Sequence, residues 1–150
     1  MTEIYVDADA CPVKDEIYRV ADRHNLKVYV VSNAFMRLPR SPLIERVLVD
    51  EGPDVADDWI ADNATAEDIA ITADIPLAAR CVKAGVTTIN PNGKPFTDDN
   101  IGMTLATRNL MTDLRETSNT QTYNASFTKQ DRSRFLQALE NAVQTIKRRG

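Results

Sequence analysis

Acidic side chains directly follow several of the apolar segments in this 150-residue sequence. Asp7 and Asp9 come after the apolar run at 4–6, and Asp74 comes after a second run at 69–71. Residues two apart in an extended chain project on the same face, so Asp7 and Asp9 can share a ligand. Neighbouring carboxylates disfavour each other's ionised form unless a cation neutralises them. We therefore expect a cation beside these acids.

A hard divalent ion suits this set of acids better than zinc does. Mg²⁺ and Mn²⁺ prefer oxygen ligands, and such ions activate water and stabilise charge at phosphorus. The sequence thus predicts a Mg²⁺- or Mn²⁺-dependent hydrolase acting on phosphodiester bonds. The predicted metal ligands are Asp7, Asp9, Asp57, Asp58 and Asp74, of which Asp7, Asp9 and Asp74 are the predicted catalytic residues. A single Asp at a helix start is also commonly a cap, which is the alternative interpretation of Asp57 and Asp58.

Polar and basic side chains near the same strand ends are predicted to bind phosphate. Arginine can hold a phosphate through two parallel hydrogen bonds, and hydroxyl and amide groups add single ones. The alternative for each cation is a solvated surface charge. The candidates are Lys14, Ser32, Asn33, Arg37, Arg40 and Arg80.

The elements that must position these side chains alternate between strand and helix. Apolar runs predict strands at 3–8, 27–31, 46–49, 69–72 and 86–89, and amphipathic patterns predict helices at 12–25, 54–64, 76–84, 97–116 and 128–149. This order is typical of an α/β fold with a mostly parallel sheet of four to five strands flanked by helices. The ligand crevice of such a sheet lies at the carboxyl ends of its strands. We expect one domain over 1–150, with a mobile loop at 117–127.

Composition narrows the class of protein. A net charge of −4 gives no general attraction for nucleic acid, so a polyanionic substrate needs a local basic patch or a metal. No apolar stretch is long enough to cross a bilayer and no signal peptide is evident, so we expect a cytoplasmic protein that makes no contact with membranes. Cys11 and Cys81 match no paired metal spacing and are expected to be packing residues. The oligomeric state is left open.

Six short motifs resemble the YaiI/YqxD family of bacterial proteins of unassigned function, over nearly the whole chain. They lie at 5–15, 37–42, 56–60, 71–81, 90–93 and 99–102. That family is in turn similar to PIN-like metal-dependent ribonucleases, which implies a three-layer PIN-like fold, a Mg²⁺ or Mn²⁺ cofactor and an RNA substrate.

Each acid of the PIN pattern is matched to a residue of this sequence. The resemblance places the first acid at Asp7, the helix acid at Asp57 or Asp58, and the acid of the Thr-x-Asp setting at Asp74. A further acid would be Asp98 or Asp99. The additional Asp9 and the Cys-Pro that follows it depart from the usual PIN pattern.

Two other functions fit part of the sequence. An Asp-x-Asp start is similar to that of haloacid-dehalogenase-like phosphatases, in which Asp7 would attack phosphorus, Asp9 would move the proton and Ser32 would bind phosphate. The third possibility is an RNA-binding or regulatory module that holds metal without cleaving its ligand.

Overall fold

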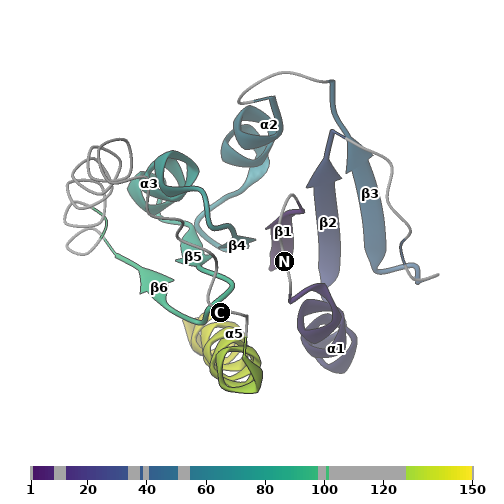
Figure 1. Ribbon diagram of the computed structural model, residues 1–150, viewed down its shortest axis with the longest axis vertical. Helices are drawn as coiled ribbons and strands as arrows, with labels where there is room; N and C mark the ends of the chain where they lie inside the picture. The colour runs from purple at the N-terminus through teal and green to yellow at the C-terminus, as the bar shows by residue number, and fades with distance from the viewer. Residues whose placement is uncertain are drawn as a thin grey trace, which may run out of the picture.

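A six-stranded, mostly parallel sheet forms the centre of the molecule (Figure 1). The computed structural model describes residues 2–8, 13–33, 38, 41–50, 55–97, 101 and 128–149. The sheet order is β3-β2-β1-β4-β5-β6, and only β6 is antiparallel to its neighbour. The strands are β1 (Glu3–Asp7), β2 (Lys27–Ser32), β3 (Ile44–Leu48), β4 (Ile69–Ile71), β5 (Thr87–Ile89) and β6 (Pro95–Phe96).

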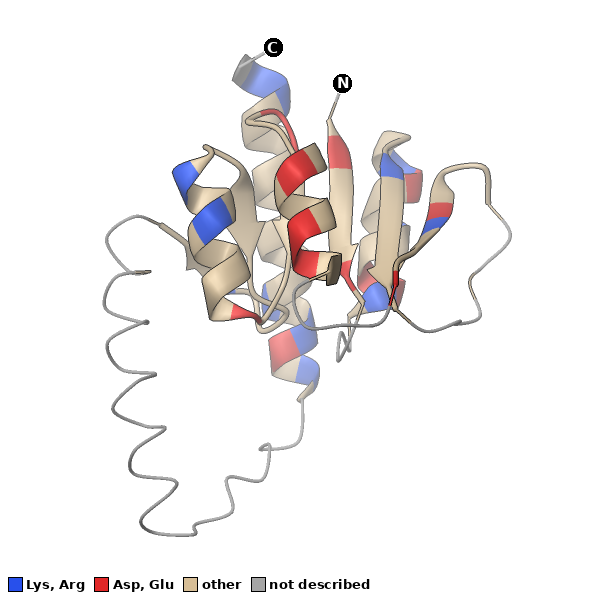
Figure 2. Cartoon of the chain, turned by 90° about the horizontal axis from the view of Figure 1, so that it is seen from above, with Lys and Arg blue, Asp and Glu red and all other residues tan. Residues whose placement is uncertain are grey.

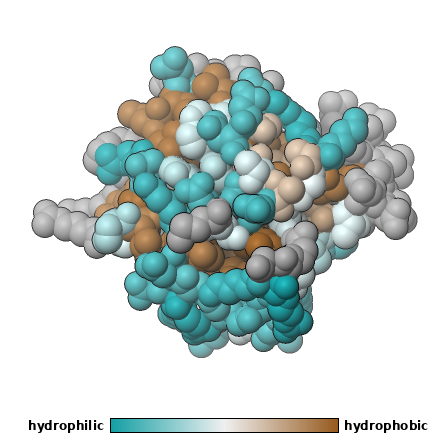
Figure 3. Space-filling view, turned by 180° about the vertical axis from the view of Figure 1, so that it is seen from behind, coloured by the Kyte–Doolittle hydropathy of each residue, from teal (hydrophilic) through white to brown (hydrophobic). Residues whose placement is uncertain are grey.

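Four helices of the described chain cover the two faces of this sheet. They are α1 (Lys14–His24), α2 (Val55–Asn63), α3 (Ile75–Lys83) and α5 (Lys129–Arg149). Figure 1 shows α1 and α5 on one face and α2 and α3 on the other. The outward surfaces of α1 and α5, at the bottom of Figure 3, are mostly hydrophilic, as expected of helices with one face toward solvent.

The core on the α1/α5 face is built from aliphatic side chains and one aromatic ring. Val20 from α1 and Phe135 and Leu139 from α5 are fully buried against Ile4 and Val6 of β1. Successive strand residues point to opposite faces, so Tyr5 and Asp7 belong to the α2/α3 face. The single strand β1 thus contributes to both cores.

Aromatic rings pack on the α2/α3 face. The rings of Tyr5 and Tyr29 stack with centroids 5.1 Å apart, and Trp59 lies 5.8 Å from Tyr5 and 5.9 Å from Tyr29. Tyr29 Oη donates a hydrogen bond to Glu3 Oε2 over 2.9 Å. Burial and this neighbouring carboxylate raise the pKa of Tyr29 to about 12, so the phenol remains protonated at neutral pH.

The sequence-based prediction of an α/β fold with a mostly parallel sheet is confirmed, and the structure has one more strand than the four to five expected. The additional strand is β6, in which Thr88 pairs with Phe96 and Ile89 with Pro95. The predicted helix at 97–116 lies almost entirely outside the described residues, as does the predicted loop at 117–127. In the part of the chain that the structure describes, no helix combines the length and apolar character needed to cross a membrane.

Candidate functional site

The sheet reverses its strand order between β1 and β4. From β1 the chain passes to β2 and β3 on one side, then returns to β4 and β5 on the other side of β1. Open α/β sheets bind ligands in the crevice outside the carboxyl ends of the strands at such a reversal. Asp7 is the last residue of β1, and Thr72 follows the last residue of β4. The topology therefore makes this edge the candidate site.

Asp7 and Asp74 are joined there by the hydroxyl of Thr72. Thr72 Oγ1 donates to Asp7 Oδ2 over 2.9 Å, and it accepts from the backbone N–H of Asp74, also over 2.9 Å. Thr72 is buried, with 1% of its surface exposed. A hydroxyl has one proton, so its donation to Asp7 and its acceptance from Asp74 set its orientation.

Asp74 also begins the helix that leaves the site. Its Oδ1 accepts from the backbone N–H of Leu77 over 3.0 Å, and Pro76 stands in the first turn of α3. This is a standard N-cap, in which a carboxylate also interacts favourably with the positive end of the helix dipole. The cap interpretation of Asp74 is therefore confirmed, and it occupies one carboxylate oxygen, Oδ1.

The two acids in the first turn of α2 are Asp57 and Asp58, and Asp58 is directed toward α3. Asp58 Oδ1 accepts from Arg80 Nη1 over 2.7 Å, and more than two fifths of each side chain is exposed. The hydrogen bond from Arg80 to Asp58 raises the pKa of Arg80, and desolvation offsets this effect in part. The negative charges of Asp58, Asp62 and Asp57 raise this pKa further. Arg80, predicted to bind phosphate, and Asp58, predicted to bind metal, are thus partners of each other.

The other predicted phosphate-binding residues are placed as follows. Lys14 is the first residue of α1 and is partly exposed at the carboxyl edge. Ser32, the last residue of β2, is 1% exposed, whereas the next residue, Asn33, is exposed. Arg37 and Arg40 lie outside the described residues, as do Asp9, Cys11, Asp98 and Asp99.

The structure also brings to this edge basic side chains that we did not predict from the sequence. Helix α5 runs parallel to α1, since Arg132 pairs with Glu16 at the start of α1 and Glu140 pairs with Arg23 near its end. The first turns of α5 therefore lie at the carboxyl edge, as Figure 2 shows. The unpredicted cations there are Lys94, Lys129, Arg132 and Arg134. The sequence signal was a cluster of positive charge in the first turns of a long helix, where the helix dipole disfavours it.

The possible ligand atoms at the point where the strand order reverses are oxygens, which suit a hard cation. Asp7 and Asp74 contribute carboxylate oxygens and Thr72 a hydroxyl, and oxygen donors are those that Mg²⁺ and Mn²⁺ prefer. Within the described residues no three His, Cys, Asp or Glu side chains form a group able to hold a metal ion. Of the predicted ligands, the described structure thus connects Asp7 with Asp74. It does not describe Asp9.

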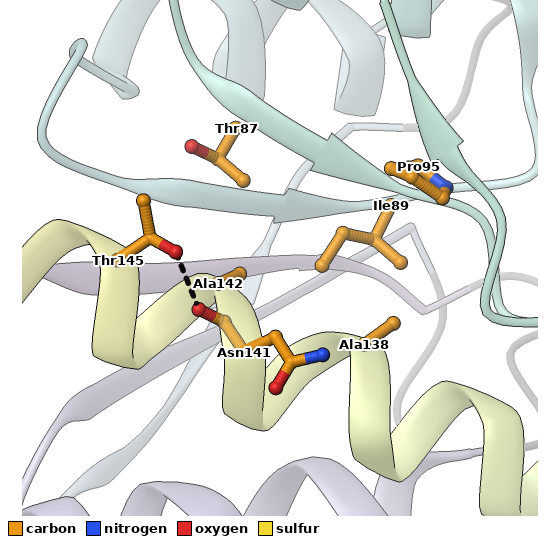
Figure 4. A pocket seen from close by; sticks show the side chains of 7 residues that line it. All are labelled: Thr87, Ile89, Pro95, Ala138, Asn141, Ala142 and Thr145. Carbon is orange, nitrogen blue, oxygen red and sulfur yellow. Dashed lines mark hydrogen bonds between the residues drawn. The ribbon is translucent and has the colours of Figure 1, made fainter.

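A separate hollow of about 380 Å³ lies between α5 and strands β5 and β6 (Figure 4). Its lining consists of Thr87, Ile89, Pro95, Ala138, Asn141, Ala142 and Thr145. Figure 4 shows Thr145 bonded to the backbone carbonyl of Asn141, to which its hydroxyl donates over 2.8 Å. None of these seven side chains is acidic or basic, and Ile89 belongs to the α1/α5 face. The hollow therefore has no acid–base groups and is not the site that contains Asp7.

Cys81 is buried on the inner side of α3, as the sequence predicts. Burial raises the pKa of its thiol to about 11, against a smaller lowering effect of Arg80. The thiolate is therefore scarce at neutral pH, which makes Cys81 a packing residue rather than a nucleophile.

Comparison with known proteins gives a family and no structural precedent. The model of the uncharacterized YaiI/YqxD family matches residues 5–145. A UPF0178 protein of Rhodopseudomonas palustris is 61% identical over 99% of this chain and 94% of its own length. The UPF0178 protein of Nitrobacter winogradskyi is 61% identical over 97% of this chain and 92% of its own length. That of Parvibaculum lavamentivorans is 58% identical over 99% of this chain and 98% of its own length. No solved structure matches. With a family model over most of its length and relatives at this identity, the chain belongs to the YaiI/YqxD family.

Proposed function

We propose that this protein is a Mg²⁺- or Mn²⁺-dependent hydrolase that cleaves phosphodiester bonds of RNA. The observation that supports this proposal is the hydrogen-bonded connection from Asp7 through Thr72 to Asp74 at the point where the strand order reverses. The resemblance to PIN-like nucleases, whose acids lie at the same edge of a parallel sheet, points in the same direction. We also propose that it acts in the cytoplasm.

The residues assigned to the metal are Asp7, Asp9 and Asp74. Asp9 enters the proposal from its position in the sequence, two residues after Asp7. When bound, the metal supplies an activated water and positive charge near the phosphorus. Asp57, in the first turn of α2, is retained as a further ligand candidate, whereas the Arg80 pairing of Asp58 gives that carboxylate another partner.

The protein's own groups would prepare the acids for this task. The Thr72 hydroxyl fixes the orientation of the Asp7 carboxylate through Oδ2, and the cap to Leu77 fixes Asp74 through Oδ1. A ligand that binds a fixed carboxylate does not lose free energy in ordering it. Lys14 and Asn33, and on sequence grounds Arg37 and Arg40, are proposed to hold the phosphates of the substrate.

The test uses purified protein, a labelled single-stranded RNA and added Mn²⁺, Mg²⁺ or EDTA. We expect cleavage with either metal, none in EDTA, and a loss of cleavage in Asp7→Asn and Asp74→Asn. Asp62→Asn is the matched control, because Asp62 is an exposed acid of α2 and the substitution removes the same charge. Cleavage that survives Asp7→Asn and Asp74→Asn would disprove the assignment.

The same protein samples test the two alternatives. Hydrolysis of a phosphomonoester without RNA cleavage would indicate the phosphatase-like function, in which Asp7 and Asp9 act on phosphorus. RNA binding that needs metal but leads to no cleavage would indicate the non-catalytic module.

A further inference from the structure

Five basic side chains from three separate segments border the carboxyl edge on its α1/α5 side. We call them the α5 basic edge: Lys14, Lys94, Lys129, Arg132 and Arg134. In Figure 2, the end of α5 at this edge of the sheet has patches of Lys and Arg. All except Lys14 were absent from the phosphate-binding residues that the sequence predicted.

Two contacts hold the three segments together. Arg132 Nη1 lies 3.3 Å from Glu16 Oε1, which joins α5 to the first turn of α1, where Lys14 begins the helix. The turn after β5 lies directly on α5, because a Cβ on Gly93 would be 2.7 Å from the backbone carbon of Arg134. Lys94, the next residue, therefore lies beside the start of α5.

The edge has an excess of positive charge in a protein whose net charge is −4. Within the described parts of its three segments, the five cations stand beside three carboxylates, Asp15, Glu16 and Asp131. The side chains of Arg132 and Arg134 are 43% and 59% exposed although each makes an ion pair. The Arg134–Asp131 pair is the more exposed of the two and contributes little to stability, so the Arg134 guanidinium can exchange its carboxylate for a phosphate at small cost. Arg132 keeps its pair with Glu16, whose side chain is only 12% exposed, and adds its positive charge to the edge.

We propose that the α5 basic edge binds phosphates of a single-stranded RNA whose scissile bond lies at Asp7, which rests on the function proposed above. Phosphate neutralisation by Lys and Arg supplies most of sequence-independent affinity for nucleic acid. Lys129 and Arg134 are five residues apart, about 7.5 Å along a helix, so they can contact different phosphates of one strand. The RNA then reaches the acids from the α1/α5 side.

The test measures binding without cleavage. Fluorescence anisotropy with a short labelled oligouridine, in EDTA and between about 50 and 200 mM salt, gives Kd and its salt dependence for the intact chain. The test variant is Lys129→Gln with Arg134→Gln, which leaves the Arg132–Glu16 pair in place. That pair is kept because Glu16 Oε2 is buried without a hydrogen-bond partner, so loss of Arg132 would threaten folding.

The control variant is Lys83→Gln with Arg148→Gln, which also removes one exposed Lys and one exposed Arg. Lys83 ends α3, and Arg148 lies 14 residues after Arg134, about 21 Å along α5 and away from the carboxyl edge. We expect the test variant to raise Kd and to reduce the slope of log Kd against log salt by about 1.4, two contacts at about 0.7 each. The control variant should change neither.

Equal effects of the two variants, an unchanged Kd in the test variant, or no binding by the unaltered chain would each overturn this proposal. The cleavage assay is separate. RNA that binds through the edge and is not cleaved would count against the hydrolase and leave the binding surface standing. If the test variant cleaves RNA as well as the unaltered chain does, the result would count against the binding surface and leave the hydrolase standing.

Discussion

Thr72 Oγ1 donates to Asp7 Oδ2 across the junction of two parallel strands, 65 residues apart in sequence and 2.9 Å apart in space. Thr72 is the residue after β4, and Asp7 is the last residue of β1. The same hydroxyl accepts from the N–H of Asp74. One buried hydroxyl thus links the carboxylate of Asp7 to the backbone of Asp74, two of the three acids to which we assign the metal.

Replacing Thr72 with Val tests this hydroxyl, because Val has nearly the same shape. The N–H of Asp74 and the carboxylate of Asp7 would each lose a partner, and we expect the unfolding free energy to fall by about 1–3 kcal/mol. We also expect RNA cleavage to fall in kcat with little change in Kd for RNA. Thr72→Ser, which restores a hydroxyl, should recover both properties. Wild-type cleavage by Thr72→Val would show that the hydroxyl does not position Asp7.

Asp74 offers a way to separate a cap from a ligand. Asn is about as good an N-cap as Asp, so Asp74→Asn should retain most of the stability, whereas Asp74→Ala should lose about 1 kcal/mol. We expect cleavage to be lost in both variants, because neither has the carboxylate charge. Urea unfolding and RNA cleavage measured on the same samples check this. Full activity in Asp74→Asn would reduce Asp74 to a helix cap.

Periodic patterns predicted most of the elements because their causes are local. The helix at 76–84 was predicted from its proline and its terminal glycine, and α3 is observed at Ile75–Lys83. Strand β6 was not predicted, since two residues that include Pro95 have no period to detect and pair only because the 90–94 turn brings them to β5.

Only those residues of the candidate site that directly follow a strand could be predicted from the sequence. Asp7 and Asp74 were identified because each follows an apolar strand, and a parallel sheet collects such ends at one edge. The pairing of Asp58 with Arg80 depends on how two helices pack. The position of Arg132 likewise depends on α5 running parallel to α1. The positive charge at the start of α5 is visible in the sequence, but the partner of each of these residues depends on tertiary packing and is not.

Glu140 should make stability depend on pH in the acid range. Its carboxylate accepts from Arg23 Nη1 over 2.6 Å, and its contact with His24 Nε2 measures 2.5 Å. Lys147 Nζ lies 2.9 Å from His24 Nδ1; since the ammonium can only donate, Nδ1 accepts and Nε2 has the hydrogen. Burial alone would raise the pKa of Glu140, but the hydrogen bonds from His24 and Arg23 outweigh it and lower the pKa from its ordinary 4.5.

The sign of the pH effect follows from that lowered pKa. At a pH between the pKa of Glu140 in the folded protein and its ordinary pKa in the unfolded chain, the unfolded chain binds more protons. The stabilisation is therefore complete above about pH 4.5 and is lost as the pH falls through the pKa of the folded protein. We expect Glu140→Gln to lower the unfolding free energy at neutral pH and to flatten its decline below pH 4.5. Asp62→Asn, at an exposed position on another helix, is the control. Parallel acid curves for the unaltered chain and Glu140→Gln would contradict the prediction.

Gly93 and Gly85 form a matched pair for the contact between the β5–β6 turn and α5. Both have positive φ, +93° and +83°, so alanine at either position incurs a backbone cost of about 1–2 kcal/mol. At Gly85 the new Cβ would meet only the Ala66 side chain, at 3.5 Å, whereas at Gly93 it would lie 2.7 and 2.8 Å from backbone atoms of Arg134 and Phe135. Gly93→Ala should therefore lower the free energy of unfolding in urea clearly more than Gly85→Ala does. Gly93→Ala should also weaken RNA binding, because the substitution moves Lys94 away from the start of α5. Equal losses of stability in the two variants would show that the turn does not rest on α5.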